Sequence, residues 1–423
     1  MKVAVIGGGI AGNVAAYHLS RDHEVRLFEA GDHLGGHTHT HDLEWQGKSY
    51  SIDTGFIVFN DRTYPNFMGL LDEMGVKYQP TEMSFSVRSD ARRLEYNGHS
   101  LNTLFTQRRN LFRPVFLRMI REIMRFNREA PQHYSEGKAE ISLGEYLLKN
   151  GYSSEFSNLY IIPMGAAIWS TDPMMMKQFP AAFFIRFFIN HGLLEITDRP
   201  QWYVIEGGSK QYLEPMKQGY ADGIRLNTPV ESVSRIGNSV QITTSTFGKE
   251  LFDAVVIATH SDQALRLLQD PTTEESEVLG AIPYQGNQAL LHTDSSVMPK
   301  RSLAWASWNY HIGHTEDKVT LSYDMNRLQN VQAPVNFLVT LNNAESVDAD
   351  KVIKELYYEH PLYTEQSVKA QARRHEISGC NRTFYCGAYW GNGFHEDGVV
   401  SALKAVEEFK EFEHELMSLS RAS

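Results

Sequence analysis

The feature that most constrains the fold is a glycine-rich turn near the start of the chain, between an apolar segment and a helical one. Residues 2–6 are rich in β-branched apolar side chains, three glycines follow at 7–9, and apolar side chains recur at helical spacing over 10–22. A strand buried in a parallel sheet and the helix after it have these patterns. Residues 24–29 repeat the strand pattern. The sequence therefore predicts a β–turn–α–β unit.

The turn has the spacing Gly-x-Gly-x-x-Gly, at Gly7, Gly9 and Gly12. In dinucleotide sites the first glycine permits the tight turn, the second lets the backbone approach the pyrophosphate, and the third lets the helix pack closely. The N–H groups and the dipole of that helix attract phosphate. Glu29 lies 22 positions after Gly7, where a carboxylate accepts hydrogen bonds from the ribose hydroxyls. Together these features predict an adenine dinucleotide site.

A second glycine pair indicates which dinucleotide binds. Gly35 and Gly36 follow soon after Glu29. A simple nicotinamide site has no use for this pair, whereas it can bring a second backbone loop onto an extended FAD. The sequence therefore favours FAD.

With these residues the chain resembles the flavoprotein superfamily of amine oxidases, protoporphyrinogen oxidases and phytoene-type desaturases. Four islands carry the resemblance, at residues 3–38, 204–213, 229–259 and 386–399. In the first island the superfamily has an arginine after the glycine pair, where this chain has His37. A charge contact to the phosphate is therefore not carried over to that position.

The resemblance implies an α/β fold in which a Rossmann-type FAD-binding domain is interleaved with an α+β substrate domain, as in amine oxidases. The FAD-binding domain is expected at residues 1–75, 205–275 and 378–423, and the substrate domain at 76–204 and 276–377. The residues expected to bind FAD, noncovalently, are Gly7, Gly9, Ile10, Ala11, Gly12, Glu29, Ala30, Gly35, Gly36, His37, Thr38, Thr54, Gly55, Val230, Ala258, Gly387, Asp397, Gly398 and Val399.

The last island also suggests catalytic residues. A helix is expected from about Gly398 to Met417, with its first N–H groups facing the flavin, where they would stabilise negative charge on the reduced ring. Tyr389 and Trp390 are candidates to wall the site. His395, and with it Glu396, is a candidate for proton transfer, and structural or flavin-contacting roles remain open for all four.

Two patterns near these motifs are not expected to add chemistry. His37, His39 and His41 alternate but have no acidic or cysteine partner at zinc spacing, so no metal site is expected. The only cysteines, Cys380 and Cys386, are too few for a disulfide framework.

More narrowly, residues 53–57 and 393–398 resemble a bacterial subgroup of predicted flavin oxidoreductases, similar to the flavoprotein extension of plant cyclopropane fatty-acid synthases. This kinship implies removal of hydride from a large apolar substrate, most plausibly desaturation of a methyl-branched fatty-acyl chain of phospholipid. Residues 163–169 and 179–194 are rich in aromatic and apolar side chains, which suit either a core or an apolar tunnel. The alternatives are a flavin amine oxidase acting on a soluble amine, an FAD-requiring double-bond isomerase, and a flavin-bound accessory subunit without activity.

The charge pattern bears on partners and location. Forty basic residues against 51 acidic ones give a net charge of −11, which disfavours binding to nucleic acid. Residues 108–128 nevertheless carry seven arginines around apolar side chains at helical spacing, and Pro114 and Pro131 suit the start and stop of a helix. This helix is either a solvated surface helix or a contact with an anionic membrane surface. A cytoplasmic protein, peripheral on the inner membrane face if that helix docks, is expected.

The rest of the chain has weaker patterns. Residues 76–200 are expected to be mainly helical, and 225–251 to form paired strands with a turn at Gly237. A further helix is expected at 348–358.

Overall fold

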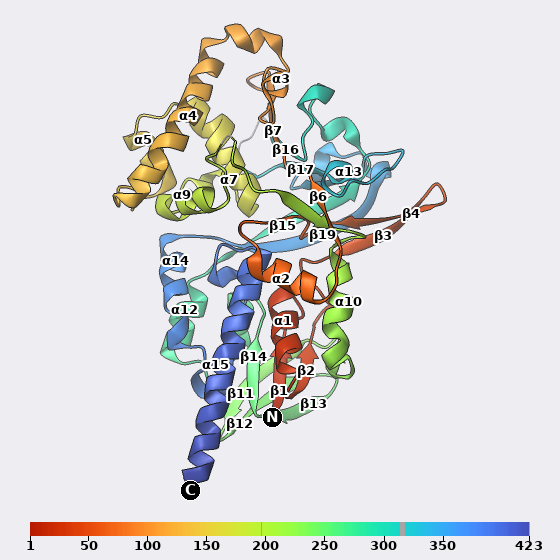
Figure 1. The fold of residues 1–423 in the computed structure, drawn as a ribbon, viewed down its shortest axis with the longest axis vertical. Coiled ribbons are helices and arrows are strands. Elements are labelled where there is room, and N and C mark those ends of the chain that lie inside the picture. Colours follow the sequence, from red (N-terminus) through yellow and green to blue (C-terminus); the bar gives the residue numbers. More distant parts are fainter. Residues whose placement is uncertain (196, 314–317, 423) are drawn as a thin grey trace.

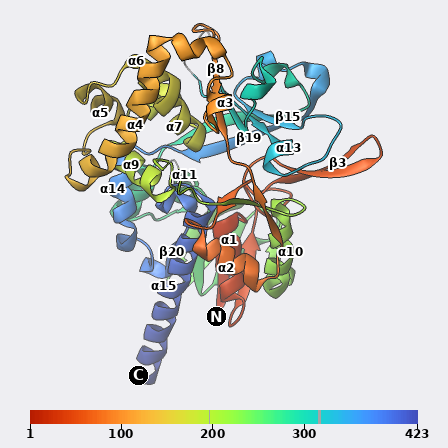
Figure 2. The ribbon, with the colours of Figure 1, turned by 45° about the horizontal axis from the view of Figure 1, so that its top comes forward.

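The computed structural model describes residues 1–195, 197–313 and 318–422. Figure 1 shows a lower half, which contains both ends of the chain, and an upper half built around a second sheet. Figure 2 shows the long helices of the upper half grouped on one side, while the hairpin that contains β3 projects on the other.

The lower half is built on a parallel sheet with the strand order β10-β2-β1-β14-β20. Alternate residues of β1 serve two cores: Val3 and Val5 pack on the helices of one face, and Ala4 and Ile6 on the strands and helices of the other. This two-sided burial explains why β1 is apolar throughout. The strands are β1 (Lys2–Ile6), β2 (Glu24–Phe28), β10 (Ile224–Arg225), β14 (Ala254–Ile257) and β20 (Thr383–Tyr385).

Two helices cover one face of this sheet, and a small antiparallel sheet with two helices covers the other. The two helices of the first face contact each other at Gly398, where a Cβ would lie 2.7 Å from Ile10 Cγ2 of the other helix. The covering elements are α1 (Ile10–Leu19), α15 (His395–Ala422), β11 (Val230–Ile236), β12 (Ser239–Thr244), β13 (Gly248–Phe252), α11 (Ser261–Leu267) and α12 (Thr273–Gly280).

The upper half contains a seven-stranded sheet with the order β19-β15-β18-β17-β16-β7-β8, in which only β16 and β7 pair in parallel. Its strands are β7 (Phe85–Ser89), β8 (Leu94–Asn97), β15 (Tyr284–His292), β16 (Trp308–Ile312), β17 (Leu321–Asp324), β18 (Leu338–Leu341) and β19 (Val352–Pro361).

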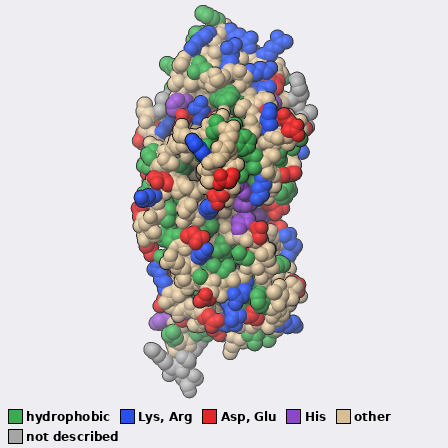
Figure 3. Space-filling model, turned by 90° about the vertical axis from the view of Figure 1, so that its right-hand side faces the viewer, with side chains coloured by type: hydrophobic (Ala, Val, Ile, Leu, Met, Phe, Trp, Pro, Cys, Tyr) green, Lys and Arg blue, Asp and Glu red, His purple; other side chains and the backbone are tan. Residues whose placement is uncertain are grey.

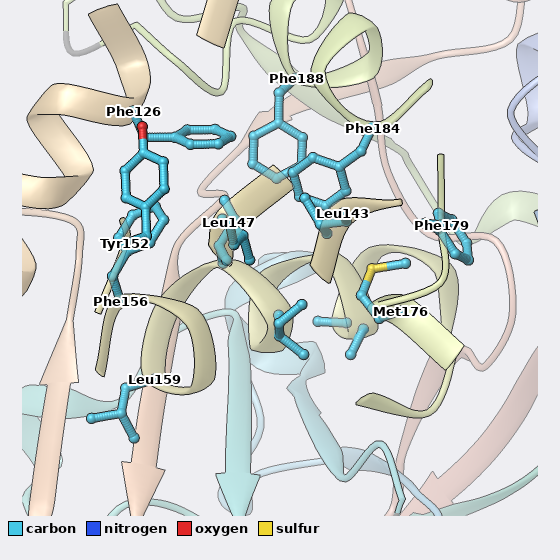
Figure 4. Packing of buried hydrophobic residues seen from close by; sticks show 14 of the residues in the cluster. Phe126, Leu143, Leu147, Tyr152, Phe156, Leu159, Met176, Phe179, Phe184 and Phe188 are labelled. Atoms are coloured by element: carbon cyan, nitrogen blue, oxygen red, sulfur yellow. The ribbon is translucent and has the colours of Figure 1, made fainter. Parts of the chain in front are cut away.

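Helices rich in aromatic residues pack beside this sheet and form the largest apolar core. Figure 4 shows part of it, where Phe184 lies beside Phe188 with ring centroids 4.2 Å apart. The helices are α3 (Leu101–Leu104), α4 (Pro114–Ser135), α5 (Leu143–Lys149), α6 (Ser154–Phe156), α7 (Ile162–Trp169), α8 (Pro173–Met176) and α9 (Ala181–Asn190).

Shorter elements connect the halves. They are β3 (Thr40–Trp45), β4 (Lys48–Asp53), β5 (Phe59–Asn60), α2 (Pro65–Glu73), β6 (Tyr78–Thr81), β9 (Trp202–Ile205), α10 (Leu213–Met216), α13 (Met325–Leu328) and α14 (Glu365–Ala372). All strands of the parallel sheet lie within residues 1–75, 205–275 and 378–423, and those of the seven-stranded sheet lie within 76–204 and 276–377. Among the described residues, no helix is long and apolar enough to cross a bilayer.

The predicted α/β class with two interleaved parts is confirmed, but several local predictions are wrong. Residues 348–358 do not form a helix, because 352–361 pair with β15 as a strand. The segment from 76 to 100 contains three strands rather than helices. Pro131 does not stop α4, which continues to Ser135.

Candidate functional site

A cavity of about 690 Å³ lies where the two halves meet, which is within the usual range of about 300–1,000 Å³ for ligand sites. Four of its lining residues, Gly7, Glu29, Ala258 and Gly387, come just after four parallel strands. Ligands of open α/β sheets bind outside this carboxyl edge. The parallel sheet therefore positions one end of the cavity.

The glycine turn leaves room for a ligand at one position and excludes a side chain at another. Gly7 has φ +100°, a conformation that favours glycine. A Cβ on Gly12 would lie 1.9 Å from the carbonyl oxygen of Gly7, whereas a Cβ on Gly9 would meet no atom within 4 Å. Gly12 thus lets α1 approach the turn, and Gly9 faces open space in the cavity lining. These are the roles that a pyrophosphate site requires.

The second glycine pair packs on the first. The amide of Gly35 donates to the carbonyl of Gly8 at 2.7 Å, and a Cβ on Gly36 would lie 3.2 Å from Gly9 Cα. Both glycines have positive φ values and line the cavity. The second backbone loop is therefore held beside the proposed pyrophosphate position, as expected for an extended dinucleotide.

Glu29 lies at the end of β2 and orders both loops around it. Its carboxylate accepts hydrogen bonds from the amides of Gly8 and Gly31, each at 2.7 Å. Each carboxylate oxygen has about two acceptor positions, so capacity remains for ligand hydroxyls. Val230 and Ala258 line the same end of the cavity.

Three histidines, His37, His260 and His360, line part of the cavity. The ring of His37 lies 5.2 Å from that of His360 and 6.4 Å from that of His260. Burial and the neighbouring His260 lower the pKa of His37 to about 4, and burial and His37 lower that of His360 to about 3. Among the described residues His37 Nε2 has no hydrogen-bond partner. At neutral pH these histidines are therefore uncharged.

His395 begins α15 and lines the cavity. Its ring stacks on Phe56 at 3.5 Å, and its Nε2 lies 3.0 Å from Thr38 Oγ1 and 3.2 Å from the hydroxyl of Tyr212. Burial, with a smaller contribution from His37, holds its pKa well below the ordinary value. His395 is therefore a neutral, fixed ring at neutral pH, which favours a positioning role over proton transfer.

Glu396 has a structural task. Its carboxylate accepts hydrogen bonds from the amides of Asn66 and Phe67, at 3.0 and 2.8 Å. These amides belong to the first turn of α2, where no intrahelical acceptor exists. The carboxylate caps that helix, so both oxygens are already engaged.

The start of α15 corrects the prediction for this helix. It begins at His395, so the amide of Gly398 already donates to the carbonyl of Phe394 at 3.1 Å. Asp397 accepts from the amide of Phe394 at 2.9 Å and caps the first turn, while Val399 is buried in the core beneath. The free N–H groups at the cavity are therefore those of the turn beginning at His395.

The remaining catalytic candidates divide. Tyr389 lines the cavity, and its buried hydroxyl has no partner among the described residues. Trp390 is not among the lining residues and packs beside the core on the other face of the sheet. Cys386 is fully buried, and burial raises the pKa of its thiol to about 12. A thiol in this state is a poor nucleophile, which agrees with noncovalent cofactor binding.

The predicted site residues thus fall into two groups. Those that line the cavity are Gly7, Gly9, Ile10, Ala11, Glu29, Ala30, Gly35, Gly36, His37, Gly55, Val230, Ala258, Gly387, Tyr389 and His395. Those that do not are Gly12, Thr38, Thr54, Trp390, Asp397, Gly398 and Val399, which support the lining residues by packing or hydrogen bonds.

The other end of the cavity is an apolar chamber, which we define by Phe56, Ile168, Trp169, Phe187, Trp202 and Trp308. The sequence indicated only residues 163–169 and 179–194 for this role. Trp202 and Trp308 were missed because they come from short strands whose patterns do not differ from ordinary core strands.

Of the three alternating histidines, His37 lines the cavity and the other two do not. The ring of His39 stacks on that of His33, with centroids 4.2 Å apart, and is tilted against that of His41, with centroids 4.1 Å apart. In the described part of the chain, no group of three or more His, Cys, Asp or Glu side chains is placed to hold a metal ion.

Residues 10–317 match the family model of flavin containing amine oxidoreductases. Fifty-five residues, 13% of this chain and 12% of the relative, are 51% identical to the flavin-dependent L-tryptophan oxidase of Lentzea aerocolonigenes. The chain thus spans about an eighth of that relative.

Solved structures show the same fold over nearly the whole chain. A redesigned putrescine oxidase superposes with a TM-score of 0.69 at 16% sequence identity. Cyclohexylamine oxidase from Brevibacterium oxydans superposes with a TM-score of 0.70 at 14% sequence identity. Each comparison covers 97% of this chain and 99% of the chain it is compared with. A CLA-producing fatty acid isomerase from P. acnes superposes with a TM-score of 0.68 at 15% sequence identity, over 96% of this chain and 98% of the isomerase chain. At these identities the likeness concerns the fold alone.

Proposed function

Because the chain belongs to the family of flavin-containing amine oxidoreductases, we propose that it is an FAD-dependent oxidoreductase that removes hydride from a large apolar substrate. The observation that carries this proposal is the continuity of the cavity, which runs from the glycine turn to the apolar chamber. A dinucleotide bound along the turn would direct its ring toward the chamber.

The residues of the chain fit FAD. Gly9 leaves space for the pyrophosphate, Gly36 lets the second loop pack on Gly9, and Glu29 offers acceptors to the ribose. The turn that begins at His395 presents N–H groups and the positive end of the α15 dipole to the cavity. Bound FAD would supply the oxidising centre that accepts the hydride. The chain holds and orients both reactants and keeps water from the apolar chamber.

The charges of the cavity favour an apolar substrate over a cationic amine. Its acidic lining residues are Glu29 and Glu359. Glu29 accepts hydrogen bonds from the two glycine loops. The carboxylate of Glu359 lies 3.6 Å from the ring of His260, a residue that follows β14. In the described lining these two are the only carboxylates, and each already has a partner outside the chamber residues.

Within this class we propose a fatty-acyl chain, and specifically a methyl-branched one in phospholipid. The resemblance of residues 53–57 and 393–398 to the subgroup described above supports this choice. A fatty acid isomerase with the same fold indicates that the architecture is compatible with an acyl substrate.

Anaerobic reduction of the flavin tests the proposal. Purified protein loaded with FAD is mixed with a methyl-branched phospholipid or with a series of soluble amines. We expect the lipid to bleach the flavin absorbance and to lose two hydrogens by mass spectrometry. Bleaching by amines alone would contradict the proposal. A lipid product of unchanged mass, formed without an electron acceptor, would identify an isomerase instead.

A variant with a matched control tests the chamber. Ile168→Asp places a carboxylate among the chamber aromatics, whereas Ile189→Asp places one on α9, where the side chain is 38% exposed. We expect the first to slow reduction by lipid at least about tenfold, with an unchanged flavin spectrum, because an apolar chain in the chamber would cover the new carboxylate and leave it unpaired. Equal rates for the two variants would mean that the chamber does not hold the substrate.

A further inference from the structure

The chain around α3 lies at the end of the upper half farthest from the parallel sheet (Figure 1, top). This part of the chain carries a cluster of arginines and exposed apolar side chains. Phe112 is 86% exposed and Leu101 is 77% exposed, although both are large apolar residues. Figure 3 shows hydrophobic, lysine and arginine side chains together at this end. We call it the apical patch and define it as Arg92, Arg93, Leu101, Arg108, Arg109, Leu111, Phe112, Arg113 and Val115.

The patch is a single surface made from two segments. The guanidinium of Arg113 donates to the carbonyl of Arg92 at 3.2 Å, and that of Arg109 donates to the carbonyl of Arg93 at 2.5 Å. These bonds join the turn between β7 and β8 to the residues before α4. They fix the arginines to backbone carbonyls, which do not neutralise their charge.

The patch is strongly positive in an acidic protein. Residues 91–121 contain seven arginines and one acidic residue, whereas the whole chain has a net charge of −11. That acidic residue, Glu95, is buried and accepts from the amides of Lys300 and Arg301, which adds two basic residues to the neighbourhood. Among the described residues, Arg93, Arg108, Arg109 and Arg113 have no carboxylate within ion-pair distance.

The structure corrects the way in which this region was expected to meet a membrane. The apolar stripe of α4 is not available, because Phe116, Met119 and Phe126 are buried in the aromatic core. Arg118 and Arg125 are also engaged, by Glu155 at 2.8 Å and by the ring of Tyr152 at 4.0 Å. The part of this region that remains available to a membrane is the apical patch, which lies before and at the start of α4.

We propose that the apical patch docks on an anionic lipid bilayer. Phe112 and Leu101 would enter the boundary between head groups and acyl chains, and the arginines around them would contact lipid phosphates. Exposed apolar side chains ringed by basic ones suit this surface, because it attracts basic groups and takes up apolar ones. This inference does not rest on the proposed function, although docking would bring lipid to the same molecule.

Vesicle binding tests the docking. The FAD-loaded protein is sedimented with vesicles of phosphatidylglycerol and phosphatidylcholine, and with vesicles of phosphatidylcholine alone. We expect binding to the mixed vesicles that weakens as salt is raised, since exposed charges are screened. The double variant Phe112→Ser with Leu101→Ser, and separately Arg93→Glu with Arg109→Glu, should each bind roughly tenfold or more weakly.

Matched controls exclude general effects. Leu148→Ser removes a side chain that is 82% exposed on α5, outside the patch. Lys48→Glu with Lys249→Glu changes the net charge as much as the arginine variant does, at exposed positions of β4 and β13. All four variants should keep the flavin spectrum of the parent, so a failure of flavin binding is seen separately. Equal vesicle binding by patch and control variants, or equal binding of the parent to both vesicle types, would overturn the proposal.

Discussion

The two halves of the molecule form their parts of one cavity in different ways. In the lower half, single backbone positions decide the geometry. A Cβ on Gly12 would lie 1.9 Å from the carbonyl oxygen of Gly7, and a Cβ on Gly35 would lie 2.4 Å from the carbonyl oxygen of Thr38. In the upper half, the cavity wall is backed by many aromatic rings, such as Trp169, which contacts four phenylalanine rings.

The difference predicts how each half responds to change. At glycine positions where the backbone is closely packed, no neighbouring group can make room, so a single added methyl group disrupts the nucleotide end of the cavity. Close-packed side chains share their contacts, so a truncation lowers stability by a graded amount and leaves the far end of the cavity intact. Mutation of each half should therefore separate cofactor binding from stability.

The largest expected effect is that of Gly12→Ala. The added methyl group would overlap the Gly7 carbonyl, so the turn or α1 must move, and we expect the purified protein to retain no flavin. Gly9→Ala is the control, because its Cβ meets no atom within 4 Å and its φ of −72° suits alanine. That variant should fold with a thermal midpoint close to the parent's and bind FAD more weakly. Normal flavin content in Gly12→Ala would break the comparison.

The upper half should respond to Phe184→Ala with a loss of stability alone. Phe184 is fully buried among Phe188, Trp169 and other rings and does not line the cavity (Figure 4). Truncation of a buried phenylalanine costs about 3–5 kcal/mol. Denaturant unfolding should show this loss, while a flavin titration of the folded protein should match the parent. Phe247→Ala, at a side chain that is 46% exposed, should change stability little.

Glu29→Gln should give a smaller effect, confined to the cofactor. Each carboxylate oxygen now accepts from one amide, that of Gly8 or that of Gly31, and glutamine replaces one of these oxygens by an NH2 group that cannot accept. Hydrogen bonds to charged groups contribute about 1.5–3 kcal/mol, so we expect FAD to bind roughly ten- to a hundredfold more weakly in a fluorescence titration. Glu24→Gln, at the exposed start of the same strand, is the control. An unchanged Kd for FAD in Glu29→Gln would show that Glu29 does not bind the ribose.

The smallest net effect is a pH dependence with opposite signs in the two halves, because the two contributions largely offset each other in the parent protein. Burial lowers the pKa of His292 in β15 to about 4, so its contribution to stability is present above pH 6.5 and is lost as pH falls to about 4. Burial raises the pKa of Asp397 in α15 to about 6, so its contribution is present below pH 3.8 and is lost as pH rises to about 6. Each pKa unit corresponds to about 1.4 kcal/mol.

Unfolding free energies measured between pH 4 and pH 7 should therefore rise less steeply with pH in His292→Gln and more steeply in Asp397→Asn. Parallel profiles for both variants and the parent would show that neither group is linked to folding.

The sequence predicted the lower half well because local rules fix it. The spacing of Gly7, Gly9 and Gly12 and the position of Glu29 follow from the geometry of one turn. The upper half depends on distant partners. Residues 352–361 have apolar side chains that also suit a helix, but they pair with residues 284–292 along the whole strand. Long-range pairing of this kind overrides local propensity.

The site shows the same division. The residues after the parallel strands were found from their motifs, whereas Trp202 and Trp308 reach the chamber only through tertiary packing. The role given to Gly398 was wrong because the helix start depends on its cap: Asp397 accepts the amide of Phe394 and begins the helix three residues earlier. No pattern in the sequence distinguishes a capping carboxylate there from one that contacts a ligand.

The strand order of the parallel sheet also has a consequence for biosynthesis. The central strand β1 pairs with β14, about 250 residues later, and the edge is completed by β20 at residues 383–385. The cofactor pocket therefore has no complete wall until residues 383–385 have left the ribosome. We expect nascent chains stalled before residue 383 to take up no flavin, so that loading of the enzyme waits for the synthesis of this last strand of the sheet.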